Sequence, residues 1–332
     1  MKLIHGGQLH TIAQHYAIPI DEWLDLSTGI SPISYPVPPI PISVWQQLPQ
    51  SSPTLLKAAQ QYYKTDNLIA TSGSQSIIET LPSIFIQHIV PTTTVWLPKV
   101  GYKEHEKAWH DHGFIINHYS QLPSADELTP HCIVVVINPN NPTGVLTAQS
   151  TLTQLLTQVE KRQGWLIVDE AFMDCVTPSQ SVASLTNNPH LFVLRSVGKF
   201  FGLAGIRLGF LSAAPIWLST LANTTGPWQV NGPAQYIAEK ALTDLNWQSE
   251  QSLQLQRLSN NLEHLLMDTF QTAVSGTSLF KTVLLPNAPE LFKQLCQQGV
   301  YVRLCDEQNA LRFGIPTDAE LEKLAKAFAK LN

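Results

Sequence analysis

Short, continuously hydrophobic runs alternate with amphipathic segments along the middle of the chain. Five of these runs are bounded by turn-forming residues, as buried strands are: 94–97, 133–137, 165–168, 191–194 and 208–212. A shorter strand is predicted at 67–71, and apolar residues at helical spacing predict helices over 55–63 and 77–86. Strands that are apolar on both faces and alternate with helices are typical of a mostly parallel sheet with helices on both sides.

The pattern changes towards both ends of the chain. Residues 30–53 are rich in proline, which predicts an extended segment without regular structure. A long amphipathic helix is predicted over 248–270, and a final helix begins at a capping box formed by Thr317 and Glu320. Three short strands are predicted between these helices: 280–285, 300–303 and 310–313.

The chain has 332 residues, of which 44% are hydrophobic, and this is enough for one large and one smaller domain. We expect an α/β fold with a mostly parallel sheet in a large domain at 46–228. A small α+β domain is expected at 229–332, and residues 1–45 are expected to form an N-terminal arm that contributes to it.

Composition excludes several classes of protein. A net charge of −5 does not favour a nucleic-acid partner. No apolar run approaches the roughly 20 residues of a membrane span, and the first residues lack the apolar part of a signal peptide. The four cysteines and 11 histidines are scattered, so neither a disulfide framework nor a metal site is indicated. We expect a cytoplasmic protein that binds neither nucleic acid nor membrane.

Small and polar residues follow the predicted strands. Ligand sites of parallel sheets form beyond the carboxyl ends of strands, so these residues are candidates for one common site. Successive strands are followed by Gly73 and Ser74, by Asn141, by Asp169, and by Ser196 with Lys199, whereas Arg207 precedes the last strand. The set contains an amide, a carboxylate, an amine and groups that suit a phosphate.

The order of Asn141, Asp169, Lys199, Arg207 and Arg312 resembles that of the aspartate-aminotransferase superfamily of pyridoxal phosphate (PLP) enzymes, called fold type I. The motifs Asn-Pro-Thr-Gly, Asp-Glu-Ala and Ser-x-x-Lys carry this resemblance, which covers nearly the whole chain. It implies the fold type I architecture and PLP as the cofactor. PLP requires a lysine for its aldehyde, a carboxylate for its ring nitrogen and an anion site for its phosphate.

The resemblance implies a role for each matching residue. Lys199 and Asp169 would be catalytic, with Lys199 forming a Schiff base with PLP and Asp169 pairing with the ring nitrogen. Asn141 would bond the 3′ oxygen, and Tyr102 would stack on the ring. The phosphate would bind to Gly73, Ser74, Gln75, Ser196 and Arg207. Related enzymes build the site from two subunits, so a homodimer is expected.

The N-terminal region is similar to the threonine-phosphate decarboxylases of cobalamin biosynthesis. His5-Gly6-Gly7 stands near the start of the chain, and a Leu-Asp-x-Ser-x-x-Ile-x-Pro stretch follows at 24–32. Phe172 follows Asp-Glu-Ala, where many aminotransferases have tyrosine. The similarity implies a lyase that converts O-phospho-L-threonine into (R)-1-aminopropan-2-ol phosphate and carbon dioxide. The substrate would be bound by His5, Gly6, Gly29, Asn141, Arg303 and Arg312.

Two other functions remain open. An aminotransferase of the histidinol-phosphate type would use the same residues. Those enzymes and some of the decarboxylases have Tyr-Pro where this chain has Leu48-Pro49, so the contact of that tyrosine with phosphate is lost or replaced here. A catalytically dead regulatory protein is a second alternative, and the presence of both Lys199 and Asp169 argues against it. Asn138 is expected to be a turn residue.

Overall fold

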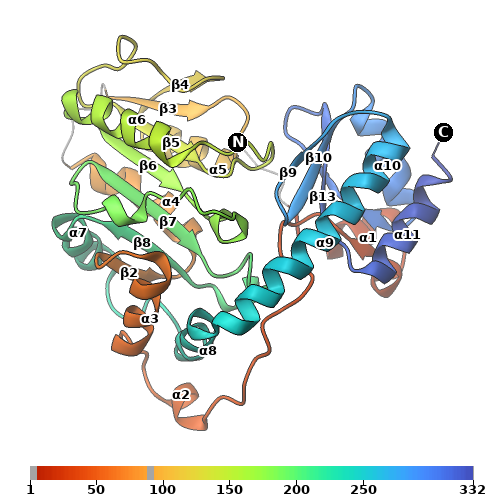
Figure 1. Cartoon of the computed structure of the whole chain (residues 1–332), viewed down its shortest axis with the longest axis horizontal. Coiled ribbons are helices and arrows are strands. Elements are labelled where there is room, and N and C mark those ends of the chain that lie inside the picture. Colours follow the sequence, from red (N-terminus) through yellow and green to blue (C-terminus); the bar gives the residue numbers. More distant parts are fainter. Residues whose placement is uncertain (1–5, 88–92, 332) are drawn as a thin grey trace. The chain divides into compact units, whose positions relative to one another are not determined.

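The computed structural model describes residues 6–87 and 93–331, which form two compact units. The large unit comprises Tyr35–Asn141 and Leu146–Asn246. The small unit comprises the described residues up to Ser34, the segment Pro142–Val145, and the described residues from Trp247 onward. In the described ranges, the large unit contains one sheet and the small unit contains two (Figure 1). Each unit also has its own hydrophobic core.

Among the described residues, the large unit is built on a seven-stranded sheet with the order β2-β8-β7-β6-β5-β3-β4. Its strands are β2 (Leu68–Thr71), β3 (Thr94–Pro98), β4 (Ile115–Tyr119), β5 (Ile133–Ile137), β6 (Trp165–Asp169), β7 (Leu191–Ser196) and β8 (Gly209–Ala213). Strand β8 runs antiparallel to both of its neighbours, and all other adjacent pairs are parallel. The predicted mostly parallel sheet is confirmed.

Helices cover both faces of this sheet. The helices are α2 (Ile42–Gln46), α3 (Pro53–Tyr63), α4 (Ser74–Phe85), α5 (Lys103–Asp111), α6 (Gln149–Lys161), α7 (Pro215–Thr225) and α8 (Gly232–Thr243). Ile133 and Val135 of β5 pack in a core with α4, α5 and α7, whereas Val134 and Val136 pack in a second core with α6. Successive strand residues point to opposite faces, so these cores lie on opposite sides of the sheet, as predicted.

The small unit packs helices on a four-stranded antiparallel sheet with the order β12-β13-β10-β9. The strands of this sheet are β9 (Val274–Gly276), β10 (Phe280–Leu284), β12 (Arg303–Leu304) and β13 (Ala310–Gly314). A separate two-stranded parallel sheet is formed by β1 (Leu24–Asp25) and β11 (Val300–Tyr301). The helices of the small unit are α1 (Leu9–Tyr16), α9 (Leu245–Phe270, which starts in the large unit), α10 (Ala288–Gln297) and α11 (Asp318–Phe328). Side chains of α9, α10 and α11 share a core with Val283 and Phe313. The predicted small α+β architecture is therefore observed.

Helix α9 is the longest helix in the described ranges, and neither it nor another described helix is long and apolar enough to cross a membrane. A cytoplasmic location stays a prediction.

Two local expectations were wrong. The proline-rich segment 30–53 contains helix α2, which fits between Pro41 and Pro49 because no proline interrupts its five residues. The strand expected at 300–303 is divided between two sheets: β11 pairs with β1, and β12 pairs with β13. The partner β1 comes from the N-terminal segment, which a local pattern at 300–303 cannot reveal.

The boundaries between the two units in the sequence differ from those expected after residues 45 and 228: they fall after Ser34 and after Asn246. Tyr35 already belongs to the large unit, where its N–H donates to the carbonyl of Phe201 at 2.8 Å. Helix α8 also belongs to the large unit, because the Oε1 of Gln235 accepts a hydrogen bond from the N–H of Ser52 at 2.9 Å. These contacts link residues that lie far apart in the sequence.

The predicted capping box of α11 is present: the hydroxyl of Thr317 accepts from the N–H of Glu320, and the carboxylate of Glu320 accepts from the N–H of Thr317. Thr317→Ala is expected to lower the free energy of unfolding by about 1 kcal/mol, because it removes the side-chain cap. Thr317→Ser keeps the hydroxyl and is expected to stay within about 0.3 kcal/mol of the parent. Denaturant unfolding followed by circular dichroism measures both, and equal losses in the two variants would contradict the capping role.

Candidate PLP site and substrate-binding residues

The site residues predicted in the large unit lie at one edge of its sheet. Asp169 is in register with Ile137 of β5 and Leu194 of β7. Because β8 is antiparallel, its first residue, Gly209, lies at the same edge, in register with both Ser196 and Thr71. The segments that follow β2, β5, β6 and β7 and the segment that precedes β8 are therefore brought together, as ligand sites of α/β proteins require.

A phosphate cradle forms where α4 begins. Gly73 caps this helix with a φ of +87°, and a β-carbon at this position would lie 3.0 Å from the Nη2 of Arg207. The Arg207 guanidinium therefore lies against the start of the helix. A β-carbon at Gly209 would lie only 2.9 Å from the backbone nitrogen of Ser74, so this approach also requires glycine. Helix N-terminal N–H groups, a guanidinium and the neighbouring Ser196 hydroxyl suit a phosphate.

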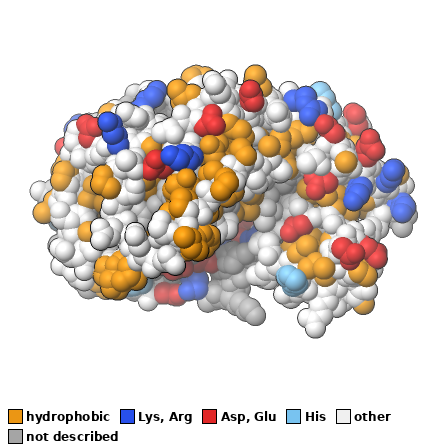
Figure 2. Space-filling view, turned by 90° about the horizontal axis from the view of Figure 1, so that it is seen from below, with side chains coloured by type: hydrophobic (Ala, Val, Ile, Leu, Met, Phe, Trp, Pro, Cys, Tyr) orange, Lys and Arg blue, Asp and Glu red, His pale blue; other side chains and the backbone are white. Residues whose placement is uncertain are grey.

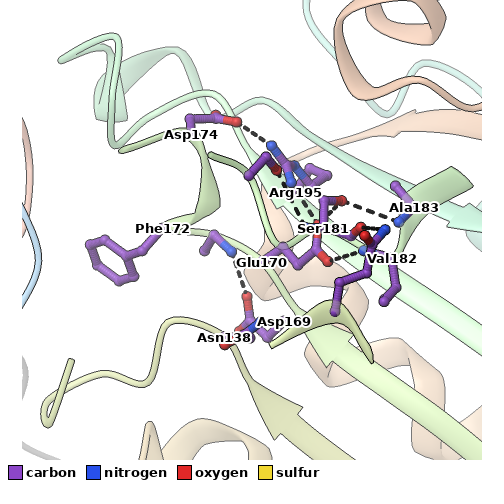
Figure 3. Close-up of polar contacts among 12 residues, drawn as sticks. Asn138, Asp169, Glu170, Phe172, Asp174, Ser181, Val182, Ala183 and Arg195 are labelled. Atoms are coloured by element: carbon purple, nitrogen blue, oxygen red, sulfur yellow. Dashed lines mark hydrogen bonds and ion pairs between the residues drawn. The ribbon is translucent and has the colours of Figure 1, made fainter. Parts of the chain in front are cut away.

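The buried carboxylate of Asp169 is held at both oxygens. Its Oδ2 lies 2.9 Å from the Nε2 of His105. Its Oδ1 accepts a hydrogen bond from the N–H of Ala171 at 3.0 Å, and Figure 3 shows Asp169 with the turn that follows it. A carboxylate with a fixed orientation suits a protonated ring nitrogen. His105 was missed in the sequence; it lies in the first turn of α5, and the centre of its ring is 6.3 Å from the ring centre of Tyr102, the residue that caps this helix.

Two further contacts join predicted residues. The Nζ of Lys199 lies 5.6 Å from the centre of the Phe172 ring. The hydroxyl of Tyr102 donates to the Oε1 of Gln75 at 3.0 Å, and the Gln75 amide nitrogen contacts the carboxylates of Glu79 and Glu104. Gln75 is thus held beside Tyr102, and its predicted contact with phosphate stays a prediction.

The segment after β5 contains two asparagines with different roles: Asn138 stabilises the turn, and Asn141 is the candidate cofactor-binding residue. Asn138 is fully buried, and its amide group donates to the carbonyl of Thr147 and accepts from the N–H of the same residue. It is therefore a turn residue, as expected. Asn141 is the last residue of this segment in the large unit, and the small-unit segment Pro142–Val145 follows directly. The hydrogen bond from Asn141 to the cofactor stays a prediction.

In the small unit, Arg312 is buried beside the N-terminal segment. Its Nη2 donates to the carbonyl of Ser27 at 2.7 Å. Gly6 packs on the same carbonyl, because a β-carbon at Gly6 would lie 2.2 Å from the Ser27 oxygen. Gly29 is buried in the same segment, whereas His5 lies outside the described residues. The structure therefore brings Gly6 and Arg312, both predicted to bind substrate, to one place.

Arg303 and Thr282 flank Arg312. Both lie directly opposite Arg312 in the antiparallel sheet, so the three side chains share one face. Arg303 pairs with Asp306 at 3.1 Å, and the hydroxyl of Thr282 donates to the carbonyl of Pro142 at 2.6 Å. Thr282 was not predicted, because a threonine in a strand gives no signal by itself. Its contact holds the residue after Asn141 on the face that carries both arginines.

The fold and this edge of the sheet define a PLP-dependent enzyme of fold type I. The chain belongs to the aminotransferase class I and II family, whose sequence pattern matches residues 46–328. It is 39% identical to the threonine-phosphate decarboxylase of Pseudomonas aeruginosa over 316 residues, which cover 95% of this chain and 94% of that protein. It is 35% identical to the threonine-phosphate decarboxylase of Sinorhizobium sp over 339 residues, which cover 99% and 98%.

A solved structure shows the same fold. The L-threonine-O-3-phosphate decarboxylase of Porphyromonas gingivalis matches with a TM-score of 0.75 at 17% identity, over 92% of this chain and 98% of that one. The predicted family, fold and PLP dependence are confirmed. The residues present fit PLP, because the edge supplies an amine, a fixed carboxylate and a phosphate cradle. Within the described ranges, no group of three or more His, Cys, Asp or Glu could hold a metal ion.

Gly73→Ala is expected to raise the dissociation constant for PLP about tenfold or more, because its methyl group would displace the Arg207 guanidinium. Gly113→Ala is the matched control, since Gly113 has a φ of +83° but a β-carbon there meets nothing within 4 Å. Absorbance titration of each apoprotein with PLP measures the affinity. Equal affinities in the two variants would show that Gly73 has no role in the cradle.

Proposed function

We propose that the protein is a lyase that decarboxylates O-phospho-L-threonine to (R)-1-aminopropan-2-ol phosphate, a step of cobalamin biosynthesis. The observation that carries this proposal is the 39% identity with a threonine-phosphate decarboxylase over 95% of the chain. Two features support it further: Phe172 stands where many aminotransferases have tyrosine, and Gly6 packs on Ser27 beside Arg312.

When bound, PLP supplies an electron sink for the electron pair that remains when a bond at the α-carbon breaks. Lys199 holds the cofactor in the resting enzyme. Once released by the substrate amine, the Lys199 Nζ would be the group that returns a proton to the α-carbon after carbon dioxide has left. Asp169 stabilises the proton on the ring nitrogen, and Asn141 donates a hydrogen bond to the 3′ oxygen.

The substrate has a carboxylate and a phosphate, so it needs two anion sites besides the phosphate cradle of the cofactor. Arg312, with Arg303 on the same sheet face, binds the carboxylate, because a guanidinium can donate two parallel hydrogen bonds to it. The N-terminal segment with His5, Gly6 and Gly29 binds the substrate phosphate.

PLP would stabilise the electron pair of whichever bond at the α-carbon is aligned with its π system. Arg312 would decide between two outcomes by holding the substrate carboxylate in one direction. Alignment of the bond to the carboxylate would give decarboxylation, whereas alignment of the C–H bond would give transamination. Arg312 is held by the Ser27 carbonyl, which restricts the directions its guanidinium can take.

Incubation of the PLP-loaded protein with O-phospho-L-threonine, without a keto acid, is expected to release carbon dioxide and the amino-alcohol phosphate in equal amounts. Lys199→Ala is expected to form neither product, because it lacks the amine that holds the cofactor and donates the proton. Phosphorus NMR and carbon dioxide trapping measure the two products. Transamination of histidinol phosphate with 2-oxoglutarate and no carbon dioxide release would establish the aminotransferase alternative instead.

The protein is also proposed to form a homodimer. Four large hydrophobic side chains are exposed within a short stretch of the large unit, namely Val37 (53%), Ile42 (70%), Trp45 (60%) and Leu48 (65%). Figure 2, viewed from the side on which α2 lies in Figure 1, shows hydrophobic side chains at the surface among polar ones. Clustered exposed apolar residues are typical of protein interfaces, and a second copy would remove them from water.

Trp45→Glu is expected to weaken the dimer about 100-fold or more, because it would place an unpaired charge in an apolar contact. Ile216→Glu is the matched control, since Ile216 is 67% exposed at the start of α7, outside this stretch. Sedimentation velocity over a range of concentrations measures dissociation. A monomeric parent protein, or equal effects of the two variants, would contradict the assigned interface.

A further inference from the structure

A buried arginine joins two segments that carry site residues. Arg195 directly precedes Ser196 in β7 and is 4% exposed. Its Nη1 donates to the Oε2 of Glu170 at 2.6 Å, and its Nη2 donates to the Oδ1 of Asp174 (Figure 3). Glu170 directly follows Asp169, and Asp174 lies two residues after Phe172. Arg195 thus ties the turn after β6 to the end of β7.

The contacts of this cluster are specific. Glu170 is fully buried and also accepts hydrogen bonds from the hydroxyl of Ser181 and the N–H of Val182. Burial raises the pKa of the Glu170 and Asp174 carboxyls, and the Arg195 guanidinium acts against that shift. A buried ion pair often stabilises a fold no more than an apolar cluster of the same volume. The arrangement is therefore better explained by the geometry it imposes than by stability.

The turn held by Arg195 also orients Asp169. The N–H of Ala171, the residue after Glu170, donates to the Oδ1 of Asp169 at 3.0 Å. The direction of the Asp169 carboxylate therefore depends on where the turn places this N–H group. The same turn places the Phe172 ring 5.6 Å from the Nζ of Lys199.

We propose that Arg195 is a positioning residue: by holding Glu170 and Asp174 it fixes the turn that aims Asp169 at the ring nitrogen of PLP. This inference rests on the proposed roles of Asp169 and Lys199. A lysine at position 195 keeps the positive charge but lacks the planar fork of donors that bridges two carboxylates. Arg195→Lys therefore separates the geometry of the contact from its charge.

The test is made on holoenzyme that carries PLP labelled with ¹⁵N in the ring, because the ¹⁵N chemical shift reports the protonation of the atom that faces Asp169. In Arg195→Lys this signal is expected to move towards the unprotonated value. The visible absorbance of the lysine-bound cofactor is expected to titrate about 0.5 pH unit or more away from the parent midpoint. The kcat is expected to fall about 10- to 100-fold with KM changed less than about threefold, since small misplacements act on the chemical step.

Asp174→Ala removes one of the two anchors of the turn and is expected to shift both spectroscopic signals in the same direction, so the test does not depend on the folding of one variant. Ser181→Ala is the matched control, because it removes a donor to Glu170 and leaves both ion pairs of Arg195 intact. It is expected to lower the unfolding temperature without moving either signal.

The inference would be overturned if Arg195→Lys and Asp174→Ala unfold at lower temperature but keep the ¹⁵N shift and the titration midpoint of the parent. Arg195 would then have a purely structural role. A parent enzyme without a protonated ring nitrogen or a lysine-bound cofactor would instead refute the proposed function, and the inference with it.

Discussion

The fixed orientation of the Asp169 carboxylate is the constraint on which the candidate site depends. One oxygen lies against the ring nitrogen of His105 on α5, and the other accepts the N–H of Ala171 in the following turn. A negative charge held in this way can keep a proton on the cofactor ring, which makes the ring the stronger electron sink. Because β7 is the parallel neighbour of β6, the segment with Lys199 begins at the same edge.

In the small unit, the predicted substrate-binding residues are held by backbone contacts of a similar kind. The guanidinium of Arg312 is anchored on the carbonyl of Ser27, and Gly6 packs on that same carbonyl. The face that carries Arg312 also carries Thr282, which holds the carbonyl of Pro142. Pro142 directly follows Asn141, which is proposed to bond the cofactor. The chain next to Asn141 is therefore held on the sheet face that carries Arg312.

The sequence was sufficient to predict Asp169 and Lys199 as one group, because each follows a buried strand and parallel strands align their carboxyl ends. Arg207 precedes β8, which is antiparallel to its neighbours, so its place at this edge was predicted only from the family resemblance. The sequence was not sufficient to predict His105 or the bridge from Arg195 to Glu170 and Asp174, because those contacts depend on how distant segments pack. The same limit explains why the boundary expected at 228 was displaced: α8 joins the large unit through Ser52, which lies far from it in the sequence.

The central claim is that this site breaks the bond to the carboxylate and not the bond to the α-hydrogen. A single-turnover reaction of the PLP-loaded protein with O-phospho-L-threonine labelled with ¹³C in its carboxylate tests it most directly. The account predicts that about one labelled carbon dioxide is released for each PLP and that no pyridoxamine phosphate forms, since the cofactor returns unchanged. Conversion of the bound PLP into pyridoxamine phosphate, with the label retained in a keto acid, would contradict it.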